Sequence, residues 1–288
     1  MKIITIFLSL FFAIHFGIAQ ETLSSSLLWE VTGKKVKSPS YIFGTMHLIP
    51  NEDFLFPETL QDKVRASEIL VMEIGGLNEQ MKAMQLMMLD SGSMFDYFTE
   101  EQLDSIFIYI KESLGFEEEQ MRLAFGKMKP FVLLQLFTKD AFGENPQSYE
   151  MSLELLAKEN EIRVLGLETI EEQMGFIDNL SPEDQVNMIM EALRSGGDGG
   201  SEMRKLIDVY LSQDINKIHN YTISSEMSSP EFEEDFLNNR NKNWIEPIKS
   251  IIKKNKSFIA VGAAHLGGPN GVIELLKAEG YTLTPVKL

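Results

Sequence analysis

Short apolar runs alternate with helix-like stretches along this chain, and the alternation predicts its elements. Each run is too short to form a helix, and most are closed by glycine or by polar residues. Six runs are predicted to be strands: LLWEV (27–31), YIFGT (41–45), EILVMEIGG (68–76), EIRVLGLET (161–169), SFIAVGAAH (257–265) and YTLTPVKL (281–288). Because these runs are continuously apolar, we expect a largely buried sheet.

Helical periodicity fills most of the remaining chain. PETLQDKVRASE (57–68) starts with a proline at a first helical position, and NGVIELLKAEG (270–280) ends on a glycine. The segment from about 78 to 160 has helical spacing without strand signals, and helices continue to about 254, except in SGGDGGS (195–201), which predicts a flexible loop. The pattern predicts an α/β fold, a sheet core flanked by helices, with a helical cap or insertion at about 78–160.

The N-terminus has the pattern of a secretory signal peptide. One lysine precedes an apolar stretch, and small residues stand just before Gln20. The sequence therefore predicts a signal peptide at 1–19, a domain at 20–288, and a periplasmic or secreted location without a stable membrane anchor. A retained anchor is the alternative, although the apolar stretch is short for a membrane span.

Charge and cysteine content narrow the possible partners. A chain beginning at Gln20 carries 25 basic and 43 acidic side chains, which disfavours nucleic acid and anionic lipid as partners. No cysteine is present, so neither a disulfide nor a thiol nucleophile is available. No G-x-S-x-G, P-loop or dinucleotide glycine pattern supports a serine hydrolase or a nucleotide-binding enzyme.

Two histidines occur in the same setting, at the end of an apolar run in the pattern G-x-x-H. Gly44 precedes His47, and Gly262 precedes His265. A glycine lets the backbone turn sharply and leaves room for a ligand, and the histidine then projects over the carboxyl edge of the sheet. His219 lacks both the strand and the glycine, so we interpret it as an ordinary helix or surface histidine.

Two glutamates end other apolar runs and are candidates for the same edge. Glu73 closes LVMEIGG and Glu168 closes LGLET, although a solvated glutamate at a sheet edge is the simpler interpretation of either one alone. Imidazoles together with carboxylates indicate a metal site or acid–base catalysis. Arg240, in NNRN, has a fork that could hold a substrate carboxylate or pair with a glutamate, or it is a surface arginine.

These residues resemble the TraB/GumN family, which includes the Tiki metalloproteases. The resemblance runs in order through LLWEV, SYIFGTMHL, ILVMEI, VLGLETIEEQ, NNRN and FIAVGAAHLGGPNGVIELLKAEGY. It implies a fold like that of erythromycin esterase and ChaN-type proteins, and functional histidines at His47 and His265. It also implies recurring polar residues at Glu73, Glu168 and Arg240. Where the family often has an aspartate before LGLET, Glu150 is the candidate substitute.

The resemblance implies a metal-dependent peptidase, with manganese or cobalt favoured and zinc or iron possible. On this hypothesis the metal ligands are His47 and His265 with at least one of Glu73 and Glu168. The other glutamate acts as general base or orients a ligand, and Arg240 positions a peptide or small-molecule substrate. A protein that sequesters a peptide or small ligand without turnover is an alternative, and so is a metal-free esterase-like enzyme with a histidine base. Haem binding, which is known for ChaN-like proteins, is a further alternative.

Overall fold

We describe the fold from a computed structural model of the chain. It describes residues 24–33, 36, 38–139, 142, 145–178, 180–224 and 233–288. The predicted signal peptide at 1–19 lies outside these residues. No helix within the described ranges is both long and apolar enough to cross a membrane.

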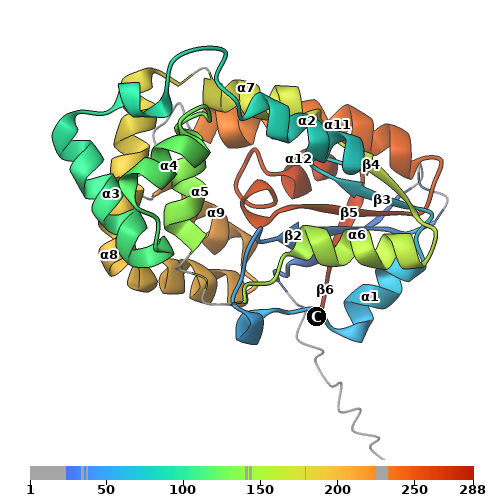
Figure 1. The fold of residues 1–288 in the computed structure, drawn as a ribbon. Coiled ribbons are helices and arrows are strands. Elements are labelled where there is room, and N and C mark those ends of the chain that lie inside the picture. Colours follow the sequence, from blue (N-terminus) through green and yellow to red (C-terminus); the bar gives the residue numbers. More distant parts are fainter. Residues whose placement is uncertain are drawn as a thin grey trace, which may run out of the picture.

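A mixed sheet forms the centre of the molecule (Figure 1). Its strands are β1 (Leu28–Thr32), β2 (Ser40–Thr45), β3 (Ile69–Met72), β4 (Arg163–Gly166), β5 (Ser257–Gly262) and β6 (Thr282–Val286). The spatial order is β4-β3-β5-β2-β1-β6. Strands β4, β3, β5 and β2 are parallel, and β1 pairs antiparallel with both β2 and β6. All six predicted strands are therefore present, and the α/β fold class is confirmed.

Helices cover both faces of the sheet and extend beyond it. They are α1 (Glu58–Arg65), α2 (Leu77–Leu86), α3 (Glu100–Leu114), α4 (Glu118–Phe125), α5 (Phe131–Lys139), α6 (Tyr149–Glu159), α7 (Ile170–Asp178), α8 (Pro182–Leu211), α9 (Ile215–Ile223), α11 (Asn239–Ile252) and α12 (Val272–Ala278). A π-helix, η4 (Glu233–Asn238), leads into α11, and a 3-10 turn, η5 (Ala263–His265), follows β5.

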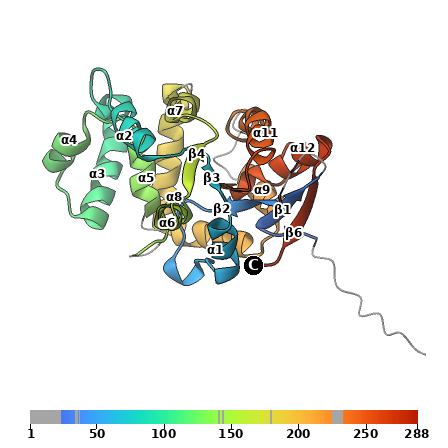
Figure 2. The same cartoon turned by 90° about the vertical axis from the view of Figure 1, so that its right-hand side faces the viewer.

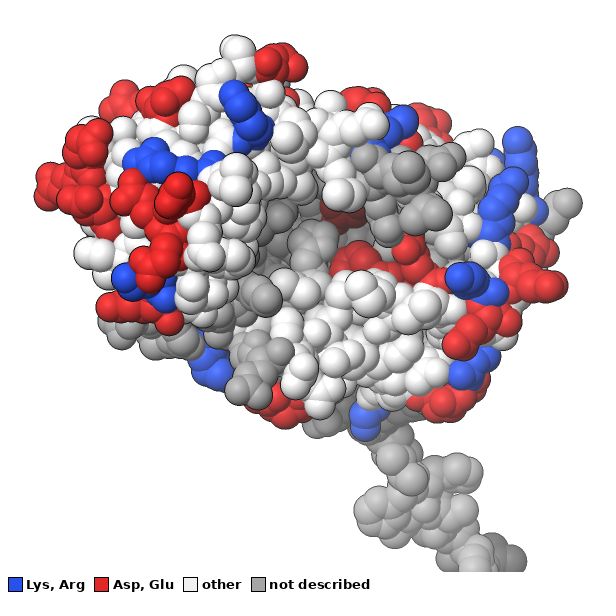
Figure 3. All heavy atoms as spheres, in the orientation of Figure 1, with Lys and Arg blue, Asp and Glu red and all other residues white. Residues whose placement is uncertain are grey.

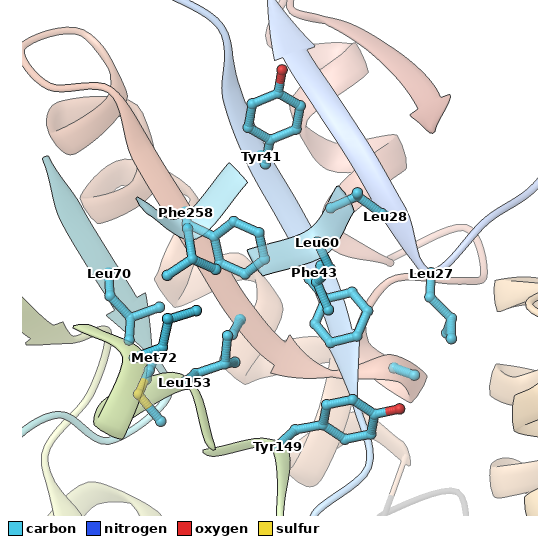
Figure 4. Packing of buried hydrophobic residues seen from close by; sticks show 14 of the residues in the cluster. Leu27, Leu28, Tyr41, Phe43, Leu60, Leu70, Met72, Tyr149, Leu153 and Phe258 are labelled. Carbon is cyan, nitrogen blue, oxygen red and sulfur yellow. The ribbon is translucent and has the colours of Figure 1, made fainter. Parts of the chain in front are cut away.

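Two apolar clusters, one on each face, hold the helices to the sheet. On one face, side chains of β2 and β5 such as Phe43 and Phe258 pack with Leu60 of α1 and with Tyr149 and Leu153 of α6 (Figure 4). On the other face, side chains from the alternate positions of the same strands pack against α11 and α12. Figure 2 shows α1 and α6 on one side of the strands and α11 and α12 on the other. This three-layer arrangement explains why β2, β3 and β5 are buried along almost their whole length. The edge strands β4 and β6 are partly exposed, so the expectation of continuously buried strands is wrong for these two.

A third cluster forms a helical cap beside the sheet (Figures 1 and 2). Helices α3, α4 and α5 and the first half of α8 bury their own apolar side chains there, including Ile106, Leu133 and Ile189. Helix α6, which lies within the segment predicted as the cap, instead contacts β3 and β4. Residues of α6 that include Met151 and Leu155 border a cavity beside the sheet.

The predicted loop at 195–201 is wrong, because helix α8 runs without a break from Pro182 to Leu211. The physical reason lies in its two ends. Val186 and Ile189 pack into the cap cluster, whereas Ile207 and Tyr210 pack into the sheet cluster. Each glycine costs about 1 kcal/mol relative to alanine in a helix, and packing at both ends of this helix outweighs that preference.

Candidate functional site

The four parallel strands place the predicted residues at one edge of the sheet. His47 lies two residues after β2, Glu73 directly after β3, Glu168 two residues after β4, and His265 at the end of the turn that follows β5. These are the carboxyl ends of neighbouring parallel strands, where open α/β sheets bind ligands. The structure gathers these residues into two groups rather than one.

Arg240 of α11 is the centre of the first group, which is buried. Its side chain is only 7% exposed, and its Nη2 atom lies 2.6 Å from Glu73 Oε2 and 2.6 Å from Glu168 Oε1. Its Nε atom also donates to both oxygens of Glu168 at 3.1 Å. The guanidinium fork therefore joins two glutamates that come from different strands. Arg240 is thus not the surface arginine that the sequence also allowed.

Trp244 and Gln173 complete the surroundings of the two glutamates. The indole Nε1 of Trp244 donates to Glu168 Oε2 at 3.1 Å, and the Arg240 guanidinium carbon lies 4.9 Å from the centre of that ring. Gln173 of α7 bridges the two carboxylates, because its Nε2 atom lies 3.3 Å from both Glu73 Oε2 and Glu168 Oε1. Three helical residues, Arg240, Trp244 and Gln173, therefore form hydrogen bonds that fix these glutamates.

His265 is the fourth member of the buried group. Its Nδ1 atom is 2.7 Å from Asn241 Oδ1, and its Nε2 atom is 3.2 Å from Arg240 Nη1. Burial lowers the pKa of His265 to about 3, against the opposing effect of Glu73. The imidazole is therefore neutral at physiological pH.

The two glutamates respond differently to their shared environment. Burial works to raise the pKa of Glu73, but the positive charges of His265, at the low pH where it is protonated, and of Arg240 outweigh burial and lower this pKa to about 2. A hydrogen bond from the Gly262 amide, 2.7 Å from Glu73 Oε1, acts in the same direction. For Glu168, burial prevails over Arg240 and raises the pKa above its usual value. Glu168 is therefore the more readily protonated of the pair.

His47 belongs to the second group, which faces solvent. Its side chain is 72% exposed, and its Nδ1 atom lies 3.2 Å from Glu150 Oε1. Thr45 Oγ1 donates to the same carboxylate oxygen at 2.7 Å, and Ser148 Oγ donates to the other at 3.2 Å. The hydrogen bond with Glu150 raises the pKa of His47 to about 9, so that the imidazolium and the carboxylate form a charged pair at neutral pH.

A cavity of about 780 Å³ adjoins this pair. His47, Glu73, Glu150 and Gln173 border it, together with apolar side chains that include Met151 and Leu155 of α6. Figure 3 shows the molecule hollowed between the cap and the sheet, with acidic side chains inside the hollow. The cavity is large enough for a small molecule or a few residues of a peptide.

The four predicted metal ligands do not form one metal site. The Arg240 guanidinium lies among Glu73, Glu168 and His265, so a positive charge already occupies the place between them. Within the described residues, no three His, Asp or Glu side chains are arranged to hold a metal ion. Four side chains of these types border the cavity, namely His47, Glu73, Glu150 and Glu154, and the first three lie at the edge of the sheet or beside it. One imidazole and two carboxylates suit manganese, iron, cobalt or zinc in donor chemistry.

The glycines of the two motifs make room for protein atoms rather than for a ligand. A Cβ atom on Gly44 would lie 3.0 Å from Cα of Ala263, in the turn after β5. A Cβ atom on Gly262 would lie 3.3 Å from Glu73 Oε1. Gly262 has a φ of −51°, which other residues also adopt. The expected role in turning the backbone is therefore wrong for Gly262, and close packing explains both glycines.

Several contributors come from helices and were not predicted as site residues. Asn241 and Trp244 follow Arg240 on α11, and Gln173 lies on α7. His219 of α9 is 3% exposed, and its Nδ1 atom lies 3.2 Å from the carbonyl oxygen of Ala264. Proximity to Arg240 in NNRN was the only signal that could have indicated Asn241. For Gln173 and His219 no sequence signal was available.

The fold and site together define an α/β protein with a polar, partly buried site at the carboxyl edge of its parallel strands, beside a ligand-sized cavity. The chain belongs to the TraB/PrgY/gumN family, whose model matches residues 27–285. No curated protein and no solved structure matches the chain. The more specific resemblance to erythromycin esterase and ChaN-type folds therefore stays a prediction.

Proposed function

We propose that the chain is an exported metal-dependent hydrolase that cleaves a peptide or small-molecule amide or ester in the cavity beside His47. The observation that carries this proposal is the convergence of His47, Glu150 and Glu73 on one cavity of about 780 Å³. An imidazole with two carboxylates is a donor set of the kind that hydrolases use to activate water. Export rests on the signal-peptide pattern at 1–19.

The protonation states of the site explain why a cation would help. At neutral pH His47 is protonated, and the pKa of Glu73 is about 2, so neither group is a good base for water. A bound divalent cation would lower the pKa of a water molecule and polarise a carbonyl group. His47, after loss of its proton, Glu150 and Glu73 are the residues that would hold it, and they would have to move together to do so, because no three such side chains within the described residues are arranged to hold a metal ion.

The remaining residues have supporting tasks on this proposal. Thr45 and Ser148 orient Glu150 through their hydroxyl groups, and Glu150 in turn orients the ring of His47. Arg240 holds the Glu73 carboxylate at the cavity wall. The apolar residues Met151 and Leu155, which are 65% and 54% exposed, offer a surface for an apolar part of the substrate.

A metal-free hydrolase is the second candidate, and one observation favours it. His47 Nδ1 lies 3.2 Å from Glu150 Oε1, in the arrangement of an acid or base oriented by a carboxylate. In that case His47 would donate a proton or a hydrogen bond to the substrate, and Glu150 would stabilise its positive charge.

The test measures hydrolysis by chelator-stripped protein on a panel of peptides, amides and esters, with manganese, cobalt, zinc or iron returned one at a time. The variants are His47→Gln and Glu150→Gln, with Glu274→Gln on the exposed face of α12 as a matched control. A cation that restores turnover in wild type and the control, but in neither site variant, supports the proposal. Turnover that ignores the chelator identifies the metal-free enzyme. Ligand binding without any turnover would identify a sequestering protein and overturn the hydrolase assignment.

A further inference from the structure

The ring of His265 has only one tautomer that satisfies both of its neighbours. An arginine side chain can only donate hydrogen bonds, so His265 Nε2, which is 3.2 Å from Arg240 Nη1, must be the unprotonated acceptor. The hydrogen then resides on Nδ1 and is donated to Asn241 Oδ1 at 2.7 Å. A neutral ring with its hydrogen on Nε2 would place two donors against each other.

A second hydrogen bond, to Asn270, fixes the orientation of the Asn241 side-chain amide. Its Nδ2 atom lies 2.9 Å from the backbone carbonyl oxygen of Asn270, which can only accept. The amide nitrogen must therefore face Asn270, and the amide oxygen must face His265. The chain of hydrogen bonds therefore begins at the Arg240 guanidinium, which can only donate, and ends at the carbonyl oxygen of Asn270, which can only accept.

Every N–H group of the Arg240 guanidinium already donates a hydrogen bond in this arrangement of its neighbours. Its Nη1 atom donates to His265 and to the carbonyl oxygen of Phe236. Its Nη2 atom donates to both glutamates, and its Nε atom donates to Glu168. All five N–H groups of the guanidinium are thereby accounted for. Loss of the acceptor at His265 would leave a buried N–H without a partner, which is costly enough to shift the fork.

Burial keeps water from substituting for any link in this chain. Asn241 is 1% exposed, His265 5% and Arg240 6%. The ring of Trp244 packs against His265 with 4.5 Å between centroids. The low pKa of His265, caused by its burial, agrees with a ring that stays neutral.

We propose that Asn241 is a positioning residue that holds His265 in its Nδ1–H tautomer, so that His265 serves as the acceptor for Arg240 and not as a metal ligand. Through Arg240, this chain of hydrogen bonds fixes the Glu73 carboxylate where it borders the cavity. The two G-x-x-H histidines then have different tasks. His47 borders the cavity where substrate binds, and His265 holds Arg240, which in turn holds Glu73. The metal-ligand part of this inference rests on the proposed function, whereas the tautomer does not.

Nitrogen NMR of the histidine rings in the full-length protein tests the tautomer directly. The His265 signal, assigned by its disappearance in His265→Gln, should be that of a neutral Nδ1–H ring. His219, whose Nδ1 atom lies 3.2 Å from the Ala264 carbonyl oxygen, also has an acceptor at Nδ1, and its signal is assigned separately by His219→Gln. Asn241→Leu removes the acceptor and should abolish the pure Nδ1–H signature, whereas Asn241→Asp keeps an acceptor and should retain Nδ1 protonation. Asn239→Leu, which removes a neighbouring amide that donates to Asp235, is the matched control and should leave the His265 signal unchanged. An Nε2–H signature for His265 in the wild-type protein, or an unchanged His265 ring in folded Asn241→Leu, would overturn the proposal.

Cation-dependent thermal stability tests the division of tasks. Manganese or cobalt should raise the unfolding temperature of wild type and of His265→Gln, in which the amide can still accept from Arg240, and should not raise that of His47→Gln. Loss of the shift in His265→Gln as well as in His47→Gln, with both variants folded, would make His265 a ligand and refute this part. If no cation shifts even the wild-type protein, the metal in the proposed function is wrong, and the NMR result still decides the role of Asn241.

Discussion

Replacing Arg240 with methionine tests whether its guanidinium holds the buried group together. Methionine retains much of the length and apolar stem of arginine but has neither charge nor donors. The side chains of Glu73 and Glu168 are only 10% and 7% exposed, and both lie 2.6 Å from Arg240 Nη2. Without Arg240, Gln173 alone would bridge the two carboxylates. Two like charges would then share a site that excludes water.

The expected loss follows from the burial of this pair. Removing one partner of a buried ion pair costs about 3–5 kcal/mol, since the other partner keeps its desolvation penalty. Glu168 limits the loss, because its pKa is already raised and it can take up a proton. We therefore expect Arg240→Met to lower the free energy of unfolding by about 3–5 kcal/mol at neutral pH. At about 2–4 °C for each kcal/mol, the unfolding temperature falls by roughly 6–20 °C.

Two companion variants separate charge from geometry. Arg240→Lys keeps a positive charge but cannot form the bidentate fork, so its loss should lie between wild type and Arg240→Met. The double variant Arg240→Met/Glu168→Gln removes one of the two opposed charges. It should therefore be more stable than Arg240→Met alone, by at least about 1 kcal/mol.

Urea unfolding followed by tryptophan fluorescence and circular dichroism measures these differences. Trp244 contacts both Arg240 and Glu168, so its emission also reports on the site. Arg194→Met is the control, because Arg194 is 66% exposed and pairs with Glu191 one turn earlier on its own helix. The reasoning fails if Arg240→Met unfolds at the same urea concentration as Arg194→Met. It also fails if Glu168→Gln gives no recovery in the double variant.

Three further predictions concern packing and processing. Gly44→Ala should cost about 1–3 kcal/mol in urea unfolding because its Cβ atom would lie 3.0 Å from Cα of Ala263. Gly175→Ala should instead stabilise by about 0.5–1 kcal/mol, because among the described residues nothing beyond its chain neighbours and its own helix backbone lies within 4 Å of the new methyl group. Equal effects of the two substitutions would contradict the packing argument. Tyr210→Phe removes a buried hydrogen bond of 3.0 Å to the carbonyl oxygen of Gly44 and should cost about 1 kcal/mol, and an unchanged urea midpoint would refute this. N-terminal sequencing of exported protein should begin at Gln20, and an uncleaved N-terminus would contradict the signal peptide.

The strands β2, β3 and β5 and their ends were predictable because these inner strands are buried on both faces, whereas the edge strand β4 is partly exposed. Such strands must be apolar throughout, so the first polar residue after each run marks the carboxyl edge of the sheet. Glu73 and Glu168 were found in this way, and the histidines by their shared motif. The same logic predicts that residues from different strands share an edge, but not which of them touch. The separation of His47 from His265 depends on side-chain directions that a linear pattern does not contain.

Helical contributors were hard to predict for a different reason. Successive side chains on a helix point in different directions around its axis. The neighbours of Asn241 and Gln173 therefore depend on how α11 and α7 pack against the rest of the protein. Composition also misled at 195–201, where glycines predicted a loop inside α8. Local preference there is weaker than the packing of the apolar residues on either side.

The repeated G-x-x-H motif has a geometric explanation in the pairing of β2 with β5. Gly44 lies beside Val261, and Thr45 lies beside Gly262, so the second motif is set one residue later along the edge than the first. The turn that follows Gly262 therefore folds over Gly44, which has no side chain to obstruct it. Gly262 in turn receives the carboxylate of Glu73 from β3. Each glycine thus accommodates the group delivered by the neighbouring strand, and this gives the two motifs a packing reason for their shared glycine.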